Sequence, residues 1–318
     1  MGQIGNVGTP ESIFERLEYG YIRNRIVPIY DANINIMTQA FLFGTAIHEG
    51  LRGYYNNQSE QLYVFRMKDH YRRMCKNAAI LKMNNYKTVD DLCKITKDLL
   101  VKNKFKEDCY IRSIVYKSAI QYGLVLEDYN DFAAFCVPQK RFQNSSDDEG
   151  IDVCISSWRR IEDNAIPARA KINGAYVNSC LALTEAKDNG FDDAIFLNED
   201  GSISEGSGMN IFVVRDNVIY TPPATDNILE GITRDTIITI VKNELQLECK
   251  IRSIDRTELY LADEIFLAGT AVEIMGVKSV DNRVINKGGT ITNIIKNLYF
   301  DIVRGNVYKY KKWLDPIY

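Results

Sequence analysis

The stretch Ser202-Ile203-Ser204-Glu205-Gly206-Ser207-Gly208-Met209-Asn210 places one carboxylate among small residues, directly before an apolar run at residues 211–214. Upstream, Ala168-Arg169-Ala170-Lys171-Ile172-Asn173-Gly174-Ala175-Tyr176 places one lysine among similarly small neighbours. Small residues let a bulky ring approach the backbone closely, and a buried carboxylate needs a partner of opposite charge. The two stretches therefore predict a site that holds a charged aromatic ring between an amine and an acid.

Pyridoxal phosphate is a cofactor that needs such a pair of groups. A lysine forms a Schiff base with its aldehyde, and a carboxylate keeps its pyridine nitrogen protonated so that the ring accepts electrons. A lone lysine or loop glutamate is most often a solvated surface charge. We nevertheless expect Lys171 and Glu205 to serve this cofactor, because small residues surround both.

The composition is that of a folded globular protein. The chain has 318 residues, which is longer than one hydrophobic core usually grows, so we expect two domains with the ligand site at their interface. The net charge of -3 gives no basic surface for nucleic acid, and no apolar run reaches the roughly 18 residues of a membrane span. We expect a cytoplasmic protein without nucleic-acid or membrane partners.

Cysteine and histidine usage restricts the chemistry further. The seven cysteines are scattered without a C-x-x-C pair, which disfavours a disulfide framework and a zinc site. A histidine-rich metal centre or a Ser-His-Asp hydrolase would have to use His48 or His70, the two histidines of the chain. We therefore expect no metal, and proton transfer by lysine, tyrosine or a carboxylate.

The expected fold class is α+β with two domains. A polar, acidic stretch at residues 143–150 separates two apolar strands, at 132–137 and 151–155. We predict a small N-terminal α+β domain at residues 1–137, a linker at 138–150 and a larger C-terminal domain at 151–318.

Short strands with few helices are expected along the chain, and the lack of sustained strand-helix alternation argues against a doubly wound parallel sheet. The expected strands include residues 21–30, 50–55, 62–65, 109–116, 194–197, 211–214, 218–220, 264–267 and 273–277. The expected helices lie at 69–83, after the capping box of Thr88 and Asp91, at 177–189 before Gly190 as C-cap, after Thr233 as N-cap, and after the capping box of Asp255 and Glu258. Residues 215–217 are expected to join two strands as a hairpin.

A phosphate group would have to bind without a P-loop, because the motif G-x-x-x-x-G-K-[ST] is absent. The segment Glu230-Gly231-Ile232-Thr233-Arg234-Asp235 offers a glycine before an expected helix, and helix N-termini bind anions through unpaired N–H groups. Gly269-Thr270-Ala271 is a second candidate. Either segment alone is also compatible with an ordinary turn.

Several motifs occur in one register from about Tyr21 to Trp313. They are Lys171 with Tyr176, Ser204-Glu205-Gly206-x-Gly208-x-Asn210, Thr221-Pro222-Pro223, Gly231-Ile232-Thr233-Arg234 and Gly269-Thr270-Ala271-x-Glu273. Together they resemble the class IV pyridoxal-phosphate aminotransferases, and the branched-chain amino acid aminotransferase subgroup most of all. The resemblance implies a small α+β domain, a larger β-barrel-like C-terminal domain with helices, cofactor between them, and a homodimer or higher homo-oligomer.

The resemblance also implies a role for each matching residue. Lys171 would be the Schiff-base lysine and proton shuttle, Glu205 the partner of the pyridine nitrogen, and Tyr176 the partner of the ring oxygen. From the residues alone, Tyr176 could equally be a core tyrosine. The implied phosphate-binding residues are Arg73, Ile232, Thr233 and Thr270. The implied substrate-binding residues are Tyr110, Arg112, Thr270, Ala271 and His48, with Arg112 receiving the distal carboxylate of glutamate through its planar fork.

One departure from the family pattern concerns the substrate pocket. The usual Phe-Glu-Gly-Ile/Leu-Arg is His48-Glu49-Gly50-Leu51-Arg52 here, and Phe43 stands where tyrosine is usual. The aromatic residue normally at position 48 helps wall the hydrophobic side-chain pocket. Histidine there puts a strict leucine, isoleucine and valine preference in question, although a lone histidine is more often structural than catalytic.

The predicted reaction is ping-pong transamination of a branched-chain L-amino acid with 2-oxoglutarate. The partners of the protein would then be small amino acids and 2-oxo acids. Other class IV chemistry is the alternative, namely D-amino acid or amine transamination or an aminodeoxychorismate-type lyase reaction. A catalytically silent binding module is a third possibility, against which the intact Lys171 and Glu205 argue.

Overall fold

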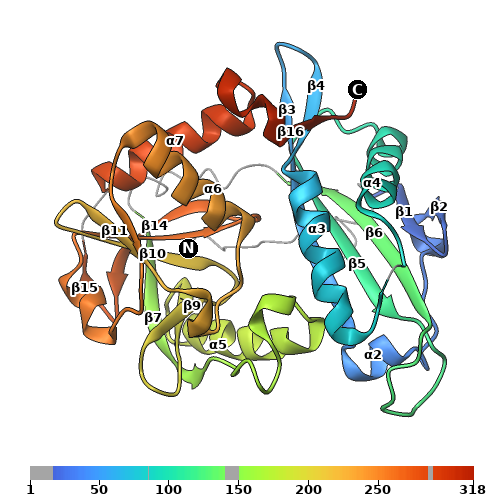
Figure 1. Cartoon of the computed structure of the whole chain (residues 1–318), viewed down its shortest axis with the longest axis horizontal. Coiled ribbons are helices and arrows are strands. Elements are labelled where there is room, and N and C mark those ends of the chain that lie inside the picture. The colour runs from blue at the N-terminus through green and yellow to red at the C-terminus, as the bar shows by residue number, and fades with distance from the viewer. Residues whose placement is uncertain (1–16, 85, 140–149, 286–288) are drawn as a thin grey trace.

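Two β-sheets with helices between and around them form the molecule, as a computed structural model shows for residues 17–84, 86–139, 150–285 and 289–318. Figure 1 shows the first half of the chain, from blue to green, on one side and the second half, from yellow to red, on the other. The first sheet has seven described strands in the order β16-β4-β3-β5-β6-β1-β2. They are β1 (Tyr19–Ile22), β2 (Arg25–Pro28), β3 (Ala46–Asn56), β4 (Gln61–Phe65), β5 (Cys109–Lys117), β6 (Asn130–Pro138) and β16 (Leu314–Pro316).

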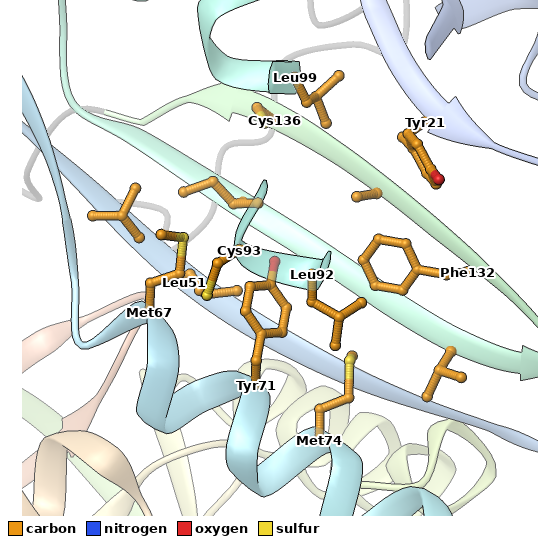
Figure 2. Packing of buried hydrophobic residues seen from close by; sticks show 14 of the residues in the cluster. Tyr21, Leu51, Met67, Tyr71, Met74, Leu92, Cys93, Leu99, Phe132 and Cys136 are labelled. Carbon is orange, nitrogen blue, oxygen red and sulfur yellow. The ribbon is translucent and has the colours of Figure 1, made fainter. Parts of the chain in front are cut away.

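The two faces of the first sheet have different tasks, because successive side chains of a strand point to opposite faces. One face is covered by helices α3 (Met67–Ala78) and α4 (Val89–Asn103), whereas the short helix α2 (Gln39–Phe43) lies at the end of β5. Leu51 of β3 and Phe132 of β6 pack there against Tyr71 of α3 and Leu92 of α4 (Figure 2). Side chains on the other face, such as His48, point toward the second half of the molecule.

Mixed pairing characterises the second sheet. The described strands follow the order β12-β11-β10-β13-β14-β7-β8-β9, and β15 pairs with β14. Strand β7 runs parallel to β8 and β14, and β11 runs parallel to β12, whereas the remaining pairs are antiparallel. The strands are β7 (Ile151–Arg159), β8 (Asp193–Leu197), β9 (Ile203–Gly206), β10 (Asn210–Arg215), β11 (Val218–Thr221), β12 (Cys249–Ile251), β13 (Glu264–Gly269), β14 (Glu273–Val280) and β15 (Arg283–Val284).

Three α-helices cover this second sheet: α5 (Tyr176–Asp188), α6 (Ile232–Ile240) and α7 (Thr290–Val303). Ile237 of α6 and Ile295 of α7 are completely buried in one cluster with the stacked rings of Phe212 and Phe266. A π-helical turn, Val241–Leu245, extends α6. Short 3-10 helices occupy Ile29–Asp31, Ala79–Leu81, Ala168–Ala170, Asn173–Ala175, Ala224–Asp226, Arg256–Leu261 and Tyr308–Trp313.

Local sequence signals explain several element ends. Thr88 accepts a hydrogen bond from the Asp91 amide at 3.1 Å, while the Asp91 carboxylate accepts one from the Thr88 amide at 2.9 Å, so the predicted capping box is confirmed. The box at Asp255 and Glu258 is confirmed as well. Asp216 and Asn217 join β10 to β11 with φ values of 51° and 61°, which is the backbone that a tight hairpin needs. Gly190, at φ +83°, follows the end of α5 as predicted.

Two local predictions are wrong. Thr233 is not the N-cap of α6, because the helix already begins at Ile232 and Gly231 is its N-cap. Glu205 does not lie in a loop but in strand β9, which pairs with β8. Helix α7 and strand β16 were not predicted.

The chain returns to its first half at its end. The main chain of Leu314 pairs with Phe65 of β4, so the last strand joins the N-terminal sheet (Figure 1). The linker predicted at 138–150 lies mostly outside the described residues. The boundaries 1–137, 138–150 and 151–318 stay a prediction.

Candidate active site

Lys171 lies at a sharp turn between two 3-10 helices. It follows Ala168–Ala170 and has a φ of +55°, a left-handed conformation that is uncommon for a side chain other than glycine. Its carbonyl accepts a hydrogen bond from the His48 amide at 3.3 Å, and its Nζ atom donates to the Tyr176 hydroxyl at 2.8 Å. Tyr176 begins helix α5, so the turn and the helix together fix the direction of the amine.

Glu205 is buried, with 4% of its surface exposed, and both of its oxygens accept hydrogen bonds. Arg160 donates to Oε1 at 2.6 Å, while the Asn210 side chain and the Leu229 amide donate to Oε2 at 2.8 and 3.1 Å. Burial raises the pKa of the Glu205 carboxyl, and Arg160, the Leu229 amide and Lys171 act in the opposite direction. The acid is thus fixed in position and surrounded by positive charge.

Helix α6 directs its N-terminus toward the same place. The amides of Ile232 and Thr233 lie in its first turn, where N–H groups have no acceptor within the helix, and the helix dipole is positive there. Arg73 of α3 reaches this end of the helix, since its Nη1 atom donates to the Glu230 carbonyl at 2.7 Å. The arrangement suits an anion such as a phosphate.

Arg73 is itself held by an acid on the first sheet. Its Nε and Nη2 atoms donate to the two oxygens of Glu49 at 2.8 and 2.7 Å, and His70 lies 2.8 Å from the same carboxylate. Burial alone would raise the pKa of Glu49, but Arg73 and His70 hold it well below its usual range. The guanidinium is therefore aimed by a carboxylate that stays ionised.

The opposite face of the first sheet contributes the predicted substrate residues. His48 and Gly50 of β3 pair with Ile114 and Arg112 of β5, and Tyr110 lies two residues before Arg112 on the same face. The Tyr110 hydroxyl lies over Gly50, where a Cβ atom would be 2.2 Å away from it. Glycine is required there because any side chain would displace the tyrosine ring.

A turn between β13 and β14 brings Thr270 and Ala271 to the cavity. The Ala271 carbonyl accepts hydrogen bonds from Arg52 at 2.9 Å and from the Gln139 side chain at 3.3 Å. Arg52 also donates to the Gln139 carbonyl at 3.1 Å and is buried, with 1% exposed. The turn of the second sheet is thus fastened to the first sheet and to the start of the linker.

All predicted site residues line one cavity between the two sheets. They are His48, Arg73, Tyr110, Arg112, Lys171, Tyr176, Glu205, Ile232, Thr233, Thr270 and Ala271. In the part of the chain that the structure describes, no group of three or more His, Cys, Asp or Glu residues is placed to hold a metal. None of the described helices has the length and apolar character that crossing a bilayer would need.

Sequence reasoning missed three residues of this site. Arg160, Asn210 and Arg52 were not predicted as site residues, although each contacts one of them or the turn that carries one. A buried carboxylate calls for a cationic partner, and this signal could have directed attention to the basic pair Arg159-Arg160. It could not have separated the two arginines.

Comparison with known proteins agrees with this geometry. A family model described as amino-transferase class IV matches residues 47–280. The chain belongs to the class IV aminotransferases. The family depends on pyridoxal phosphate, so the predicted cofactor, the two-domain α+β fold class and the aminotransferase activity are confirmed at the level of the family.

Individual relatives cover nearly the whole of this aminotransferase. It is 45% identical over 305 residues to a probable branched-chain-amino-acid aminotransferase of Aquifex aeolicus (strain VF5), a match that covers 95% of this chain and 97% of that protein. The branched-chain aminotransferase of Thermoproteus uzoniensis, solved with norvaline, has a TM-score of 0.91 and 39% identity, with 95% and 100% of the two chains covered. A third branched-chain amino acid aminotransferase, from a source abbreviated T.th. and solved with N-(5'-phosphopyridoxyl)-L-glutamate, has a TM-score of 0.89 and 32% identity, with 95% and 99% covered.

Proposed function

We propose that this class IV aminotransferase moves the amino group of a branched-chain L-amino acid to 2-oxoglutarate. The observation that carries the proposal is that Lys171, Glu205 and Arg112 open onto one cavity, in a chain whose relatives are named branched-chain aminotransferases. The relative solved with a phosphopyridoxyl derivative of glutamate supports glutamate and 2-oxoglutarate as the second substrate pair.

The residues of the cavity fit pyridoxal phosphate. Glu205 is a buried acid that needs a cationic partner in addition to Arg160, and α6 offers unpaired N–H groups to an anion. Lys171 would hold the cofactor covalently, Glu205 its pyridine nitrogen and Tyr176 its ring oxygen. Its phosphate would be bound by Arg73, Ile232, Thr233 and Thr270. When bound, the cofactor supplies an electron sink for the bonds of the substrate α-carbon.

Lys171 is the residue that moves the proton. Its Nζ atom takes the proton from the substrate α-carbon once the substrate amine has displaced it. The Tyr176 hydroxyl, 2.8 Å away, accepts a hydrogen bond from the amine and keeps it directed into the cavity. The two residues therefore act as one unit.

Substrate carboxylates are assigned to two further places. The amides of Thr270 and Ala271 would bind the α-carboxylate, and Arg52 keeps their turn in place through the Ala271 carbonyl. Arg112 would receive the distal carboxylate of glutamate, because a guanidinium binds two oxygens at once. Tyr110 lies beside it, with the Arg112 guanidinium carbon 5.3 Å from the ring centre.

We further propose that two copies of the chain assemble through the surface of α2 and the loop after β5. Large apolar side chains are exposed there, including Ile36 at 76%, Phe41 at 63%, Tyr122 at 86% and Leu124 at 78%. The two segments form one surface, since Gln39 donates to carbonyls of that loop at 2.7 and 3.0 Å. An apolar surface of this extent marks a protein interface. Light scattering should show a dimer that Phe41→Glu with Leu124→Glu converts to monomer.

A substrate panel tests the reaction. The purified protein with bound cofactor is assayed with L-leucine, L-isoleucine and L-valine against 2-oxoglutarate. We expect glutamate to form, with the parallel double-reciprocal lines of ping-pong kinetics. Activity with D-alanine or an aryl amine alone, or pyruvate release from aminodeoxychorismate, would show another class IV reaction instead.

A further inference from the structure

The position of His48 is where this chain departs from its family pattern. Its imidazole is buried, with 5% of the residue exposed, and lines the cavity on the sheet face that also presents Gly50. The ring packs edge-to-face on Tyr176, with the two centroids 4.6 Å apart. Its backbone amide donates to the Lys171 carbonyl. A polar ring thus lies directly beside the reacting amine and its tyrosine partner.

Asn173 fixes the proton on this ring. The Nδ1 atom of His48 lies 2.8 Å from the Asn173 Oδ1 atom, an amide oxygen that can only accept, so Nδ1 carries the proton. Burial, together with the nearby cations Lys171 and Arg112, lowers the pKa of His48 to about 3. At neutral pH the ring is therefore uncharged, and its Nε2 atom has a lone pair. Among the residues that the structure describes, none donates a hydrogen bond to Nε2.

We propose that His48 Nε2 is a hydrogen-bond acceptor in the substrate side-chain pocket, and that the enzyme takes L-amino acids of branched-chain size that carry a hydroxyl or amide group. The proposal rests on the transamination proposed above and adds to it the class of amino donor. A hydrocarbon ring at position 48 would leave such a group without a partner, and an unpaired polar group is costly to bury. A carboxylate side chain gains nothing from Nε2, because both atoms accept; it depends on Arg112.

Isosteric donors separate this hydrogen bond from size. Threonine and valine differ by a hydroxyl in place of a methyl group, and asparagine and leucine form a similar pair. We compare the ratio of kcat/KM for threonine over valine between the wild type and His48→Phe. One hydrogen bond predicts that the substitution lowers this ratio about 3- to 10-fold. His48→Gln, which keeps an acceptor oxygen on a side chain of similar length, should restore part of the ratio.

The histidine count of the chain allows a second readout that needs no turnover. Only His48 and His70 contribute imidazole signals, so nitrogen NMR of histidine-labelled holoenzyme gives two rings, and His48→Phe assigns them. We expect His48 to be protonated at Nδ1 and to show no titration between about pH 5 and 9, the range in which an ordinary imidazole titrates. A ring protonated at Nε2, or one that titrates in this range, would overturn the proposal.

The outcomes also distinguish this proposal from the proposed function. An unchanged threonine-to-valine ratio in His48→Phe, together with continued turnover of leucine by the wild type, overturns the role of His48 alone. If the wild type turns over neither leucine nor valine, the proposed function fails first. Should His48→Phe not fold, His48→Gln and the wild-type NMR spectrum still decide the matter.

Discussion

Arg160 and Glu205 form a buried ion pair, with the Arg160 Nη2 atom 2.6 Å from Oε1 of the carboxylate and the two side chains 12% and 5% exposed. The pair connects β9 with the segment after β7, at the cavity between the sheets. Burial by itself raises the pKa of Glu205, so the acid depends on this arginine and on its other donors to remain ionised.

Arg160→Met should destabilise the protein, because it leaves the Glu205 carboxylate buried without its cation. Breaking a buried pair in this way costs about 3 kcal/mol or more. Guanidinium denaturation measures the free energy of unfolding. Arg159→Met is the matched control, since the neighbouring arginine is exposed and should have little effect. Equal losses in both variants would mean that the ion pair is not the cause.

Gly50→Ala should displace Tyr110, because the added Cβ atom would meet the tyrosine hydroxyl at 2.2 Å and the ring at 2.8 Å. Overpacking of this kind costs about 1 to 3 kcal/mol, and KM for the amino donor should rise because Tyr110 faces the cavity. Thermal unfolding and steady-state kinetics measure both effects. Gly123→Ala is the control, as its Cβ would meet its nearest neighbour at 3.5 Å. Combining Gly50→Ala with Tyr110→Ala should recover stability, and a failure to do so would contradict the clash.

Glu49→Gln should reveal a pH-dependent contribution to stability. The pKa of Glu49 in the folded protein is depressed by Arg73 and His70, so its contribution is fully present above the unfolded value of about 4.5 and is lost as pH falls toward the folded value. We expect the variant to lose about 3 kcal/mol at pH 7 and the difference from wild type to shrink below about pH 4.5.

Denaturation at about pH 7, 5.5 and 4 tests this dependence. Asp98→Asn provides the control, because Asp98 pairs with Lys94 at the surface and should contribute under about 1 kcal/mol at any of these pH values. A Glu49→Gln penalty that stays constant down to the lowest of these pH values would show that Glu49 gains nothing from its ionised form.

Local signals in the sequence were sufficient for elements that form from neighbouring residues. The capping box at Thr88, the hairpin at Asp216-Asn217 and the end of α5 at Gly190 depend on contacts within a few residues, so the sequence displays them directly. Strand β9 was mistaken for a loop because its glycines and serines lack the usual strand character. It is a strand because β8 pairs with it, which is a tertiary cause.

Residues of the site that act across the fold were harder to predict. Lys171 and Glu205 stand in distinctive stretches, whereas Arg160 and Arg52 become meaningful only when β9 and the turn at Ala271 lie beside them. Helix α7 does show apolar residues at helical spacing, including Ile295, Tyr299 and Ile302, and that signal was missed. The pairing of β16 with β4 has no local signature at all.

The attachment point of the cofactor tests the central claim most directly. The holoenzyme is reduced with borohydride, digested, and its peptides are analysed by mass spectrometry. We expect the pyridoxyl group on Lys171, and Lys171→Ala to lose both the label and the visible absorbance. A label on another lysine would contradict the account, and the buried Lys117, whose amine donates to two carbonyls away from the cavity, is the internal comparison.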